Sequence, residues 1–459
     1  MALMKSISGI RGTIGGAVGE NLTPLDIVRF TSAYAAVIKQ KGKGNKIIVG
    51  RDGRMSGEML RQLVNQTLSG MGLDVIDLGL STTPTVEMAV VFEKAAGGII
   101  LTASHNPREW NALKLLNEKG EFISAADGKE VLRLAEKENF DYAPVEQLGK
   151  IEFKTELLDT HIQAILKHSL VNSKSIAAKK YKIVVDAINS SGAVAVPALL
   201  NALGITDITV LNAEMHGNFA HNPEPLPENL KMLCESVCDL QADLGIAVDP
   251  DVDRLCFVSE DGSLFGEEYT LVAVADYILK HRKGNTVSNL SSTRALKDIT
   301  EKYGGLYYAS AVGEVNVVEK MKVVKAVIGG EGNGGIIDPE LHYGRDALAG
   351  IALFLTHLAE SNTKASILRK SYPDYYMSKN KFDLPPGTDL KKILNAIEAA
   401  YSHFPVITTD GVKIEMEEGW VHLRASNTEP IIRIYSEAKS EAAAATLASE
   451  VMSRMKALL

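Results

Sequence analysis

The chain contains few cysteines. Three among 459 residues, Cys234, Cys238 and Cys256, cannot build a disulfide framework for a protein of this size. Cys234 and Cys238 lie four positions apart, which is a helical spacing, so we expect both to be buried in a core rather than to bind a metal. A reducing, cytoplasmic compartment follows as the expectation.

An excess of positive charge is also missing. The formal net charge is -8 and the pI about 5.8, so we expect no nucleic-acid partner. An acidic balance does not exclude anionic substrates, because one cleft can be locally basic. No run of 18 or more apolar residues occurs, and the start, MALMKSISGIRG, lacks the apolar stretch of a signal peptide. We therefore expect no membrane partner.

What the chain does have is a repeated pattern. Apolar β-like runs alternate with helical patterns between residues 46 and 355, which is typical of α/β domains with largely parallel strands. A strand, a polar turn and a helix recur at 46–57 and 182–193, and 284–296 with 304–313 resembles a third copy. Three similar α/β domains are predicted.

The last ninety residues break this rhythm with prolines. Two strands flanked by helices are predicted there, which indicates a small α+β domain. The expected limits of the four domains are 1–148, 149–254, 255–370 and 371–459.

A short polar cluster, TASHNP at 102–107, follows the apolar run Ile99–Leu101. Either it is a turn, or Ser104 is there to react. A serine hydrolase fits poorly, because the motif is not G-x-S-x-G and His105, adjacent in sequence, is not thereby placed to deprotonate Ser104.

Three carboxylates alternate in the second motif, VDPDVDR, at Asp249, Asp251 and Asp253. Carboxylates this close repel one another unless a cation lies between them, and hard oxygen ligands suit Mg²⁺ or Ca²⁺. An EF-hand is disfavoured because Arg254 stands where the loop needs glycine. A solvated acidic turn is the alternative.

Two further motifs carry polar groups after apolar runs. GEGNGG places Glu331 among glycines that let backbone approach a ligand. LRASNTEPIIRIY combines hydroxyls with guanidinium groups, a pattern suited to phosphate. Each could be a plain turn when taken alone. Together the four motifs point to phosphoryl chemistry, with a serine, a cation, a hydroxyl-reading loop and a phosphate clamp.

In this order and at these separations, the motifs resemble the α-D-phosphohexomutase superfamily, which includes phosphoglucomutase, phosphomannomutase and phosphoglucosamine mutase. The resemblance implies three similar α/β domains with mixed, largely parallel sheets around a central cleft, followed by the α+β domain. It also implies a phosphoserine at Ser104 and a Mg²⁺ ion bound by Ser104, Asp249, Asp251 and Asp253. The reaction would interconvert hexose 6-phosphate and hexose 1-phosphate through a hexose 1,6-bisphosphate, which is both intermediate and activator.

The resemblance also assigns roles to individual residues. Lys114 would be the general base, with Arg11 near the transferring phosphate and His105 beside the nucleophile; a surface lysine and a fold-holding ion pair are the alternatives for Lys114 and Arg11. Residues implied to bind the sugar are Arg254, Gly313, Glu331, Asn333 and His342. Residues implied to grip the non-reacting phosphate are Arg424, Ser426, Asn427, Thr428 and Arg433.

This chain departs from the family pattern in the sugar loop. Many relatives read G-E-x-S-G-H where Gly330–Gly335 stands here, so a histidine is missing, and His342 is the candidate substitute. The variants look most like phosphoglucosamine mutase; phosphomannomutase or phosphoglucomutase is the alternative. An inactive sugar-phosphate-binding protein, a phosphatase and a bisphosphate synthase are the rivals. A sugar phosphate is the expected partner, and the protein is expected to be a monomer or a homodimer.

Overall fold

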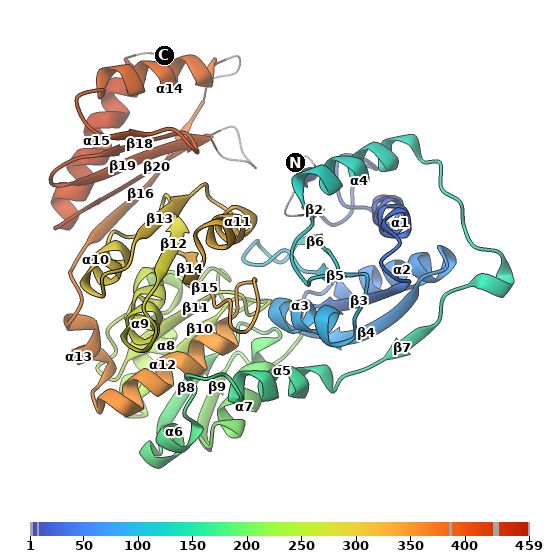
Figure 1. The fold of residues 1–459 in the computed structure, drawn as a ribbon, viewed down its shortest axis with the longest axis horizontal. Helices are drawn as coiled ribbons and strands as arrows, with labels where there is room; N and C mark the ends of the chain where they lie inside the picture. The colour runs from blue at the N-terminus through green and yellow to red at the C-terminus, as the bar shows by residue number, and fades with distance from the viewer. Residues whose placement is uncertain (1–2, 7–8, 385–387, 426–430, 458–459) are drawn as a thin grey trace.

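The computed structural model describes residues 3–6, 9–384, 388–425 and 431–457, and its strands form four separate sheets (Figure 1). We name the parts built around these sheets the first, second, third and C-terminal units, in chain order. Among the described residues, no helix has the length and apolar content needed to cross a membrane.

The first unit is a seven-stranded sheet in the order β1-β2-β6-β5-β3-β4-β7. Its strands are β1 (Met4–Ser6), β2 (Gly9–Thr13), β3 (Lys46–Arg51), β4 (Asp74–Leu80), β5 (Gly97–Leu101), β6 (Trp110–Leu116) and β7 (Ile151–Phe153). Its helices are α1 (Pro24–Lys41), α2 (Gly57–Gly70), α3 (Thr83–Phe92), α4 (Ala125–Lys137) and the short 3-10 helix η1 (Val145–Gln147). Between α4 and β7 the chain forms an arm that extends away from the rest of the molecule (Figure 1).

The second and third units each contain a four-stranded sheet, in the orders β11-β10-β8-β9 and β13-β12-β14-β15. The second unit comprises α5 (Leu157–Leu166), α6 (Ser173–Lys179), β8 (Lys182–Asp186), α7 (Gly192–Ala202), β9 (Asp207–Leu211), η2 (Pro227–Asn229), α8 (Lys231–Asp239), β10 (Leu244–Val248) and β11 (Leu255–Ser259). The third comprises α9 (Glu267–His281), β12 (Asn285–Asn289), α10 (Ala295–Lys302), β13 (Tyr307–Ser310), α11 (Glu314–Val324), β14 (Ala326–Glu331), β15 (Gly335–Ile337), α12 (Ala347–Ser361) and α13 (Ala365–Lys370).

One strand arrangement recurs in these three units, as predicted from the repeated sequence pattern. The strands β4-β3-β5-β6, β9-β8-β10-β11 and β13-β12-β14-β15 have the same order, second-first-third-fourth. In each set the first three strands are parallel and the fourth is antiparallel to the third. The prediction of three similar α/β domains with mixed, largely parallel sheets is therefore confirmed.

The C-terminal unit is an α+β unit, but its sheet has five strands rather than the predicted two. The elements are β16 (Tyr376–Asp383), α14 (Leu390–Ala400), β17 (Val406–Ile407), β18 (Val412–Glu415), β19 (Gly419–Ala425), β20 (Ile431–Ala438) and α15 (Glu441–Lys456), with the antiparallel order β16-β20-β19-β18-β17. The run predicted as one strand at 411–426 contains a hairpin of β18 and β19. β16 is an edge strand of mostly polar residues, so it lacks the apolar alternation by which a strand is recognised.

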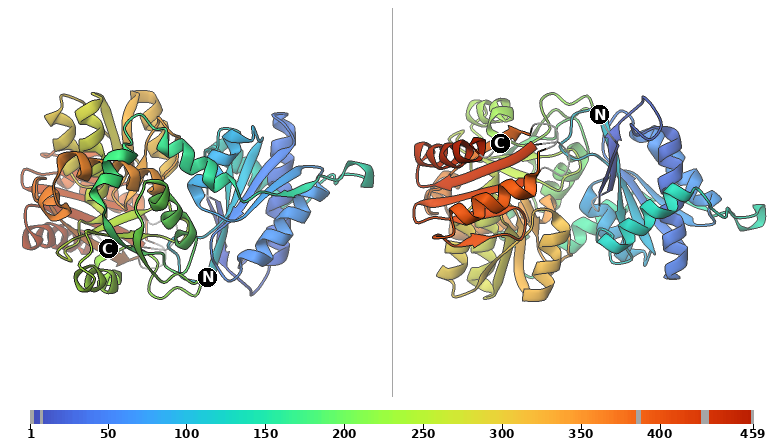
Figure 2. Two further views of the ribbon diagram at one scale, coloured as in Figure 1. Left: turned by 90° about the horizontal axis from the view of Figure 1, so that it is seen from below. Right: turned by 90° about the horizontal axis from the view of Figure 1, so that it is seen from above.

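The second and third units share one hydrophobic core. Phe257 of β11 stacks on Phe354 of α12, with ring centroids 3.9 Å apart, and a single cluster of buried residues runs through both units. The first and C-terminal units have core clusters of their own. Both views in Figure 2 show the first unit, in blue, beside the rest of the molecule.

The cysteines lie differently from the prediction in one case. Cys256 is buried and Cys234 half-buried, but Cys238 is exposed. Leu233 and Val237 are the residues of α8 that enter the core, and the two cysteines follow them on the flank of the helix, where Cys238, next to its C-terminal end, is exposed.

Candidate active site

Three of the four sequence motifs occupy equivalent positions in the three α/β units. Ser104 lies in the connection from β5 to β6, the three aspartates lie in the connection from β10 to β11, and Glu331 ends β14, just before the turn to β15. Each connection joins the third parallel strand of its unit to the antiparallel fourth. In α/β sheets, ligands bind at the carboxyl ends of the parallel strands, so the repeat itself places all three motifs at ligand-binding edges.

Ser104 is buried and its hydroxyl points at the aspartates. Ser104 is only 3% exposed, and its Oγ donates a hydrogen bond to Asp249 Oδ2 at 2.7 Å. The backbone of Ser104 has a φ of +50°, a left-handed conformation that is uncommon for residues other than glycine. Its amide donates to Thr102 Oγ1 at 2.9 Å, which fixes the backbone beside the hydroxyl.

The loop carrying Ser104 is held by Arg54, a residue that the motif analysis missed. Arg54 is 1% exposed, and Nε pairs with Asp52 Oδ2 at 3.0 Å. Its remaining donors bind four loop carbonyls, those of Ser104 at 2.5 Å, Asn106 at 2.7 Å, Pro107 at 2.7 Å and Trp110 at 2.9 Å. A planar guanidinium with its donors in a fixed fork suits this task better than a lysine ammonium would.

Asp249, Asp251 and Asp253 form a compact group, which we call the aspartate group. All three are fully buried, and one carboxylate oxygen from each lies within 4.8 Å of those of the other two. Burial, together with the charges of Asp253 and Asp251, raises the pKa of Asp249 well above its ordinary value. The connection also contains Val252 with a φ of +60°, which is unusual for a β-branched residue.

Two oxygens of the aspartate group have no hydrogen-bond partner. Asp251 Oδ1 and Asp253 Oδ1 are both buried and unsatisfied. Buried carboxylate oxygens without partners are costly, and hard oxygen donors in this arrangement match the ligands that Mg²⁺ uses in proteins. The residues present therefore fit a hard divalent cation.

Lys114, on β6, reaches into the aspartate group. Its Nζ lies 2.6 Å from Asp251 Oδ2 and 3.3 Å from Asp253 Oδ2, and Thr83 Oγ1 donates to the same Asp251 oxygen at 2.5 Å. Burial alone would lower the pKa of Lys114, but the two carboxylates outweigh burial and hold it above its ordinary value. Lys114 is thus a buried strand residue and not a surface helix lysine.

Arginines surround the serine. Arg11 Nη1 donates to Asn106 Oδ1 at 2.7 Å, and burial lowers the pKa of Arg11 to about 10. Arg254 Nε lies 4.0 Å from Asp249 Oδ2. His105 Nδ1 is 3.4 Å from Ser104 Oγ. Burial and the charges of Arg254 and Arg11 lower the pKa of His105 well below its ordinary value, so His105 is a neutral imidazole at neutral pH. Although the protein is acidic overall, positively charged groups thus lie close to Ser104 and His105.

Glu331 and Gly313, two of the residues implied to bind the sugar, are in contact. Glu331 is 4% exposed, and its Oε1 accepts from the Gly313 amide at 3.0 Å and from Asn289 Nδ2 at 2.9 Å. Arg345 Nη1 donates to Glu331 Oε2 at 3.1 Å. Burial raises the pKa of Glu331, but the Arg345 charge and the hydrogen bonds from Asn289 and Gly313 together outweigh burial and leave the pKa below its ordinary value.

Arg345 connects the sugar loop to the aspartate group, and the motif analysis missed it. Besides Glu331, it binds Asp253 Oδ2 through Nη2 at 2.6 Å and Glu314 Oε2 through Nε at 2.9 Å. Through one buried side chain the third unit is therefore tied to the aspartate group of the second.

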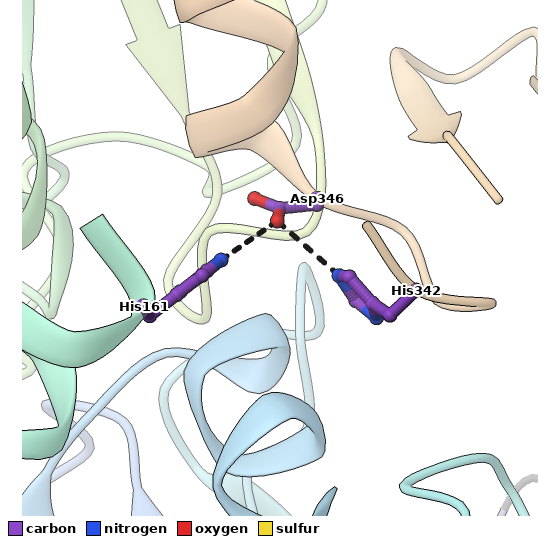
Figure 3. Close-up of side chains that lie close together, drawn as sticks. All are labelled: His161, His342 and Asp346. Carbon is purple, nitrogen blue, oxygen red and sulfur yellow. Dashed lines mark hydrogen bonds and ion pairs between the residues drawn. The ribbon is translucent and has the colours of Figure 1, made fainter. Parts of the chain in front are cut away.

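The polar contacts of Asn333 and His342 are with residues other than Glu331. Asn333 Oδ1 accepts from the Gly335 amide at 3.2 Å, a local turn contact. Among the described residues, His342 has polar contacts with Asp346, at 3.2 Å (Figure 3), and with Glu87, at 3.4 Å. The substitution of His342 for the missing sugar-loop histidine stays a prediction.

The two clamp arginines face each other across neighbouring strands. Arg424 on β19 pairs in register with Arg433 on β20, so both guanidinium groups extend from the same face of the sheet. Arg424 Nε is buried without a hydrogen-bond partner, and burial lowers the pKa of Arg424. Two adjacent like charges are unfavourable unless an anion joins them. The predicted Ser426, Asn427 and Thr428 lie outside the described residues.

Comparison with known families matches the whole arrangement. Models of the phosphoglucomutase/phosphomannomutase family match four successive segments, α/β/α domain I at residues 4–142, domain II at 159–262, domain III at 266–376 and the C-terminal domain at 381–454. The chain belongs to the phosphoglucomutase/phosphomannomutase family.

Individual relatives agree with this assignment. A Thermococcus kodakarensis protein named phosphoglucomutase/phosphomannomutase is 37% identical over 437 residues, covering 94% of both chains. A Sulfurisphaera tokodaii protein named phosphoglucosamine/phosphogalactosamine mutase is 35% identical over 457 residues, covering 96% of this chain and 97% of its own. The crystal structure of a phosphoglucomutase/phosphomannomutase family protein from Burkholderia thailandensis superposes with a TM-score of 0.86 at 26% identity, covering 99% and 97% of the two chains. The protein is thus a phosphohexomutase, an isomerase of the phosphomutase class.

Sequence reasoning missed several residues that shape this phosphohexomutase site, namely Arg54, Thr83, Asn289, Glu314 and Arg345. One signal was available. Arg54 stands in GRDGR, the polar turn of the first repeat, and a charged turn after a buried strand could have been read as part of a site. The others stand in segments without a distinctive pattern.

Proposed function

We propose that this phosphohexomutase is a phosphoglucosamine mutase. It transfers a phosphoryl group between the C6 and C1 oxygens of glucosamine phosphate through a phosphorylated Ser104 and a bound 1,6-bisphosphate. The observation that carries the proposal is the 2.7 Å hydrogen bond between Ser104 Oγ and Asp249, inside a site lined by arginines. A serine in this setting can carry a phosphoryl group, because surrounding cationic groups stabilise the dianion during transfer.

The aspartate group, with Ser104, would hold a Mg²⁺ ion. Its unsatisfied oxygens, Asp251 Oδ1 and Asp253 Oδ1, support this proposal. When bound, the cation supplies neutralisation of the charge that develops on the transferring phosphoryl group. Arg254 and Arg11 contribute to the same neutralisation from the protein side.

The two half-reactions balance within one sugar. A sugar hydroxyl attacks phospho-Ser104, its proton passes to a base, and the P–O bond to Ser104 breaks as the bond to the sugar oxygen forms, with Ser104 Oγ taking up a proton to become a hydroxyl. The bisphosphate then reorients, and Ser104 Oγ takes the phosphoryl group from the other position. No phosphate is released and no second donor is consumed, which separates a mutase from a phosphatase and from a bisphosphate synthase.

Lys114 is the proposed general base. Its Nζ is 2.6 Å from Asp251, and as an ammonium it cannot accept a proton. The pKa of Lys114 would fall when a dication binds the same carboxylates, because like charges repel. This linkage would bring the amine toward the neutral form that a base needs.

Glu331 supports the choice of an amino sugar. A carboxylate has about four acceptor positions, and Asn289, Gly313 and Arg345 use three of those on Glu331. One position is left for a substrate donor. An ionised carboxylate binds a charged ammonium group more strongly than a hydroxyl, so glucosamine gains more from Glu331 than glucose or mannose.

Arg424 and Arg433 would grip the phosphate that is not reacting. Their in-register pairing supports a shared anion. Burial lowers the pKa of Arg424 and the Glu331 charge partly offsets this, so the two side chains are within electrostatic reach of each other. A substrate could therefore contact the sugar loop and the clamp at once.

The deciding experiment compares kcat/KM for the 6-phosphates of glucosamine, glucose and mannose. We expect the highest value for glucosamine 6-phosphate, with an enzyme mass about 80 Da above that of the unmodified chain in the resting state. Phosphoglucomutase/phosphomannomutase activity is the second candidate, favoured by the name of the Thermococcus kodakarensis relative. Preference for glucose or mannose phosphate would replace the first proposal with the second.

A further inference from the structure

Two histidines and an aspartate from different parts of the chain meet at a second buried point (Figure 3). Asp346 Oδ2 lies 2.9 Å from His161 Nε2 and 3.2 Å from His342 Nε2. The side chains of His161, His342 and Asp346 are 0%, 8% and 2% exposed. One donor atom from each lies within 4.8 Å of the other two. We call these three residues the histidine cluster.

The opposite nitrogen of each imidazole faces an oxygen from α3. Thr85 Oγ1 is 3.0 Å from His161 Nδ1, and Glu87 Oε2 is 3.4 Å from His342 Nδ1. Both rings are therefore arranged alike, with Nε2 toward Asp346 and Nδ1 toward an oxygen of the first unit.

Glu87 is the independent sign that this cluster is built for a cation. It is 1% exposed, and neither of its carboxylate oxygens has a hydrogen-bond partner. His342 Nδ1 is also buried without a hydrogen bond. An ionised carboxylate in such surroundings is strongly unfavourable unless positive charge lies nearby, and Glu87 adds a second carboxylate beside that of Asp346 in the histidine cluster.

We propose that the histidine cluster is a structural site for a late first-row divalent cation of the Zn²⁺ type. His161 Nε2, His342 Nε2 and Asp346 Oδ2 are the ligands, and water can complete the shell. Imidazole nitrogens suit zinc far better than they suit Mg²⁺. Zinc bonds of 2.0–2.1 Å with tetrahedral angles place donor atoms about 3.3 Å apart, and the two N–O separations here are 2.9 and 3.2 Å.

Thr85 and Glu87 then act as the outer partners of the two histidines. A metal-bound imidazole commonly donates its other N–H to a carboxylate or another oxygen, which fixes the tautomer and the ring orientation. Thr85 Oγ1 would accept from His161, and Glu87 would accept from His342. Asp346 is itself oriented, because its Oδ1 accepts from the Leu348 and Ala349 amides at 2.9 and 3.1 Å at the start of α12.

The site would fasten three units together. His161 comes from α5 of the second unit, His342 and Asp346 precede α12 of the third, and Thr85 and Glu87 belong to α3 of the first. The same helix α3 begins at Thr83, whose hydroxyl donates to Asp251 at 2.5 Å. An occupied histidine cluster would thus fix the helix that contacts the aspartate group, without taking part in the chemistry.

The test titrates Zn²⁺, and separately Co²⁺, into the chelator-treated full-length protein in excess Mg²⁺, so that the aspartate group is already saturated. We expect one equivalent of Zn²⁺ to bind, visible ligand-field bands of four-coordinate Co²⁺, and a Zn²⁺-dependent rise in Tm. His161→Ala and His342→Ala should lose the site, and Glu87→Gln should weaken Zn²⁺ binding by about 10–100-fold.

Two control variants make the result specific. His168→Ala removes another buried histidine, paired with Asp338 at 2.9 Å outside the cluster, and should bind Zn²⁺ like the wild type. Asp249→Asn alters the aspartate group and should also retain the Zn²⁺ site. If folded wild-type protein binds no Zn²⁺, the histidine cluster is an ion-paired contact and the proposal is overturned. An unchanged affinity for Zn²⁺ in a folded His342→Ala variant would also overturn it.

Discussion

The Ser104 hydroxyl donates a 2.7 Å hydrogen bond to Asp249 although the two residues lie 145 positions apart in the chain. They occupy the same connection, third strand to fourth, in the first and second α/β units. The repeat therefore brings a nucleophile from one unit against the carboxylates of the next. Any cation held by the aspartate group would lie beside the serine oxygen.

Replacing that oxygen tests the covalent mechanism. Ser104→Ala should lower kcat by about 10⁴-fold or more, because it removes the oxygen proposed to carry the phosphoryl group. Sugar-phosphate affinity, measured by calorimetry, should change little. Ser453→Ala, an exposed serine on α15, serves as the control. Turnover close to the wild-type rate in Ser104→Ala would exclude a phosphoserine enzyme.

Asp251→Asn tests the metal assignment. The substitution removes one charge from the aspartate group and weakens the 2.6 Å contact with Lys114. We expect kcat to fall by about 10²–10³-fold and the Mg²⁺ concentration for half-maximal activity to rise. Chelation should inactivate the wild type, and added Mg²⁺ should restore it. The exposed Asp261, changed to Asn, is the control; an identical Mg²⁺ titration in both variants would remove Asp251 from the metal site.

Arg424→Ala tests the phosphate clamp. Loss of a charge-assisted hydrogen bond to the non-reacting phosphate should raise KM by about 10–100-fold with a smaller change in kcat. The Tm should not fall, because the substitution also relieves repulsion from Arg433 on the neighbouring strand. Arg454→Ala, on the exposed side of α15, should leave KM unchanged. An effect confined to kcat would assign Arg424 to the reacting phosphate instead.

Glu268 should make stability depend on pH. Burial raises the pKa of Glu268 from its ordinary value of 4.5 to about 8. Between these values the folded state binds more protons than the unfolded state, so the contribution of Glu268 is full below about pH 4.5 and is lost as the pH rises toward 8.

Glu268→Gln, which mimics the protonated form, should therefore be more stable than the wild type near pH 8, and the difference should shrink toward pH 4.5. Thermal unfolding across this range measures the effect. The exposed Glu136 on α4, changed to Gln, should show no such trend, and a difference that grows toward low pH in Glu268→Gln would contradict the raised pKa.

The three α/β units could be predicted because their strands are short, buried and separated by turn residues, all of which are local features. The strand count of the C-terminal unit could not. The polar edge strand β16 forms because it pairs with β20 at eight positions. The sequence of Tyr376–Asp383 contains no pattern that predicts this pairing. The proposed limits of the four domains stay predictions.

Most of the site residues that sequence reasoning proposed stand in the four motifs, and those it missed stand outside them. Arg54 holds carbonyls 50 to 56 positions away. Arg345 joins Glu331, which lies 14 positions away in the sequence, to Asp253, which lies 92 positions away. When the partners of a side chain are backbone groups or carboxylates far along the chain, the sequence contains no characteristic residue spacing by which the side chain could be recognised.

The sequence by itself determined which chemical groups this phosphohexomutase possesses and that three of its parts repeat one α/β pattern, because periodicity and turn chemistry are written in neighbouring residues. Only the tertiary structure decided which groups meet. Ser104 with Asp249, Lys114 with Asp251, and His161 with Asp346 are each joined across more than a hundred positions, and such contacts depend on how whole units pack against one another.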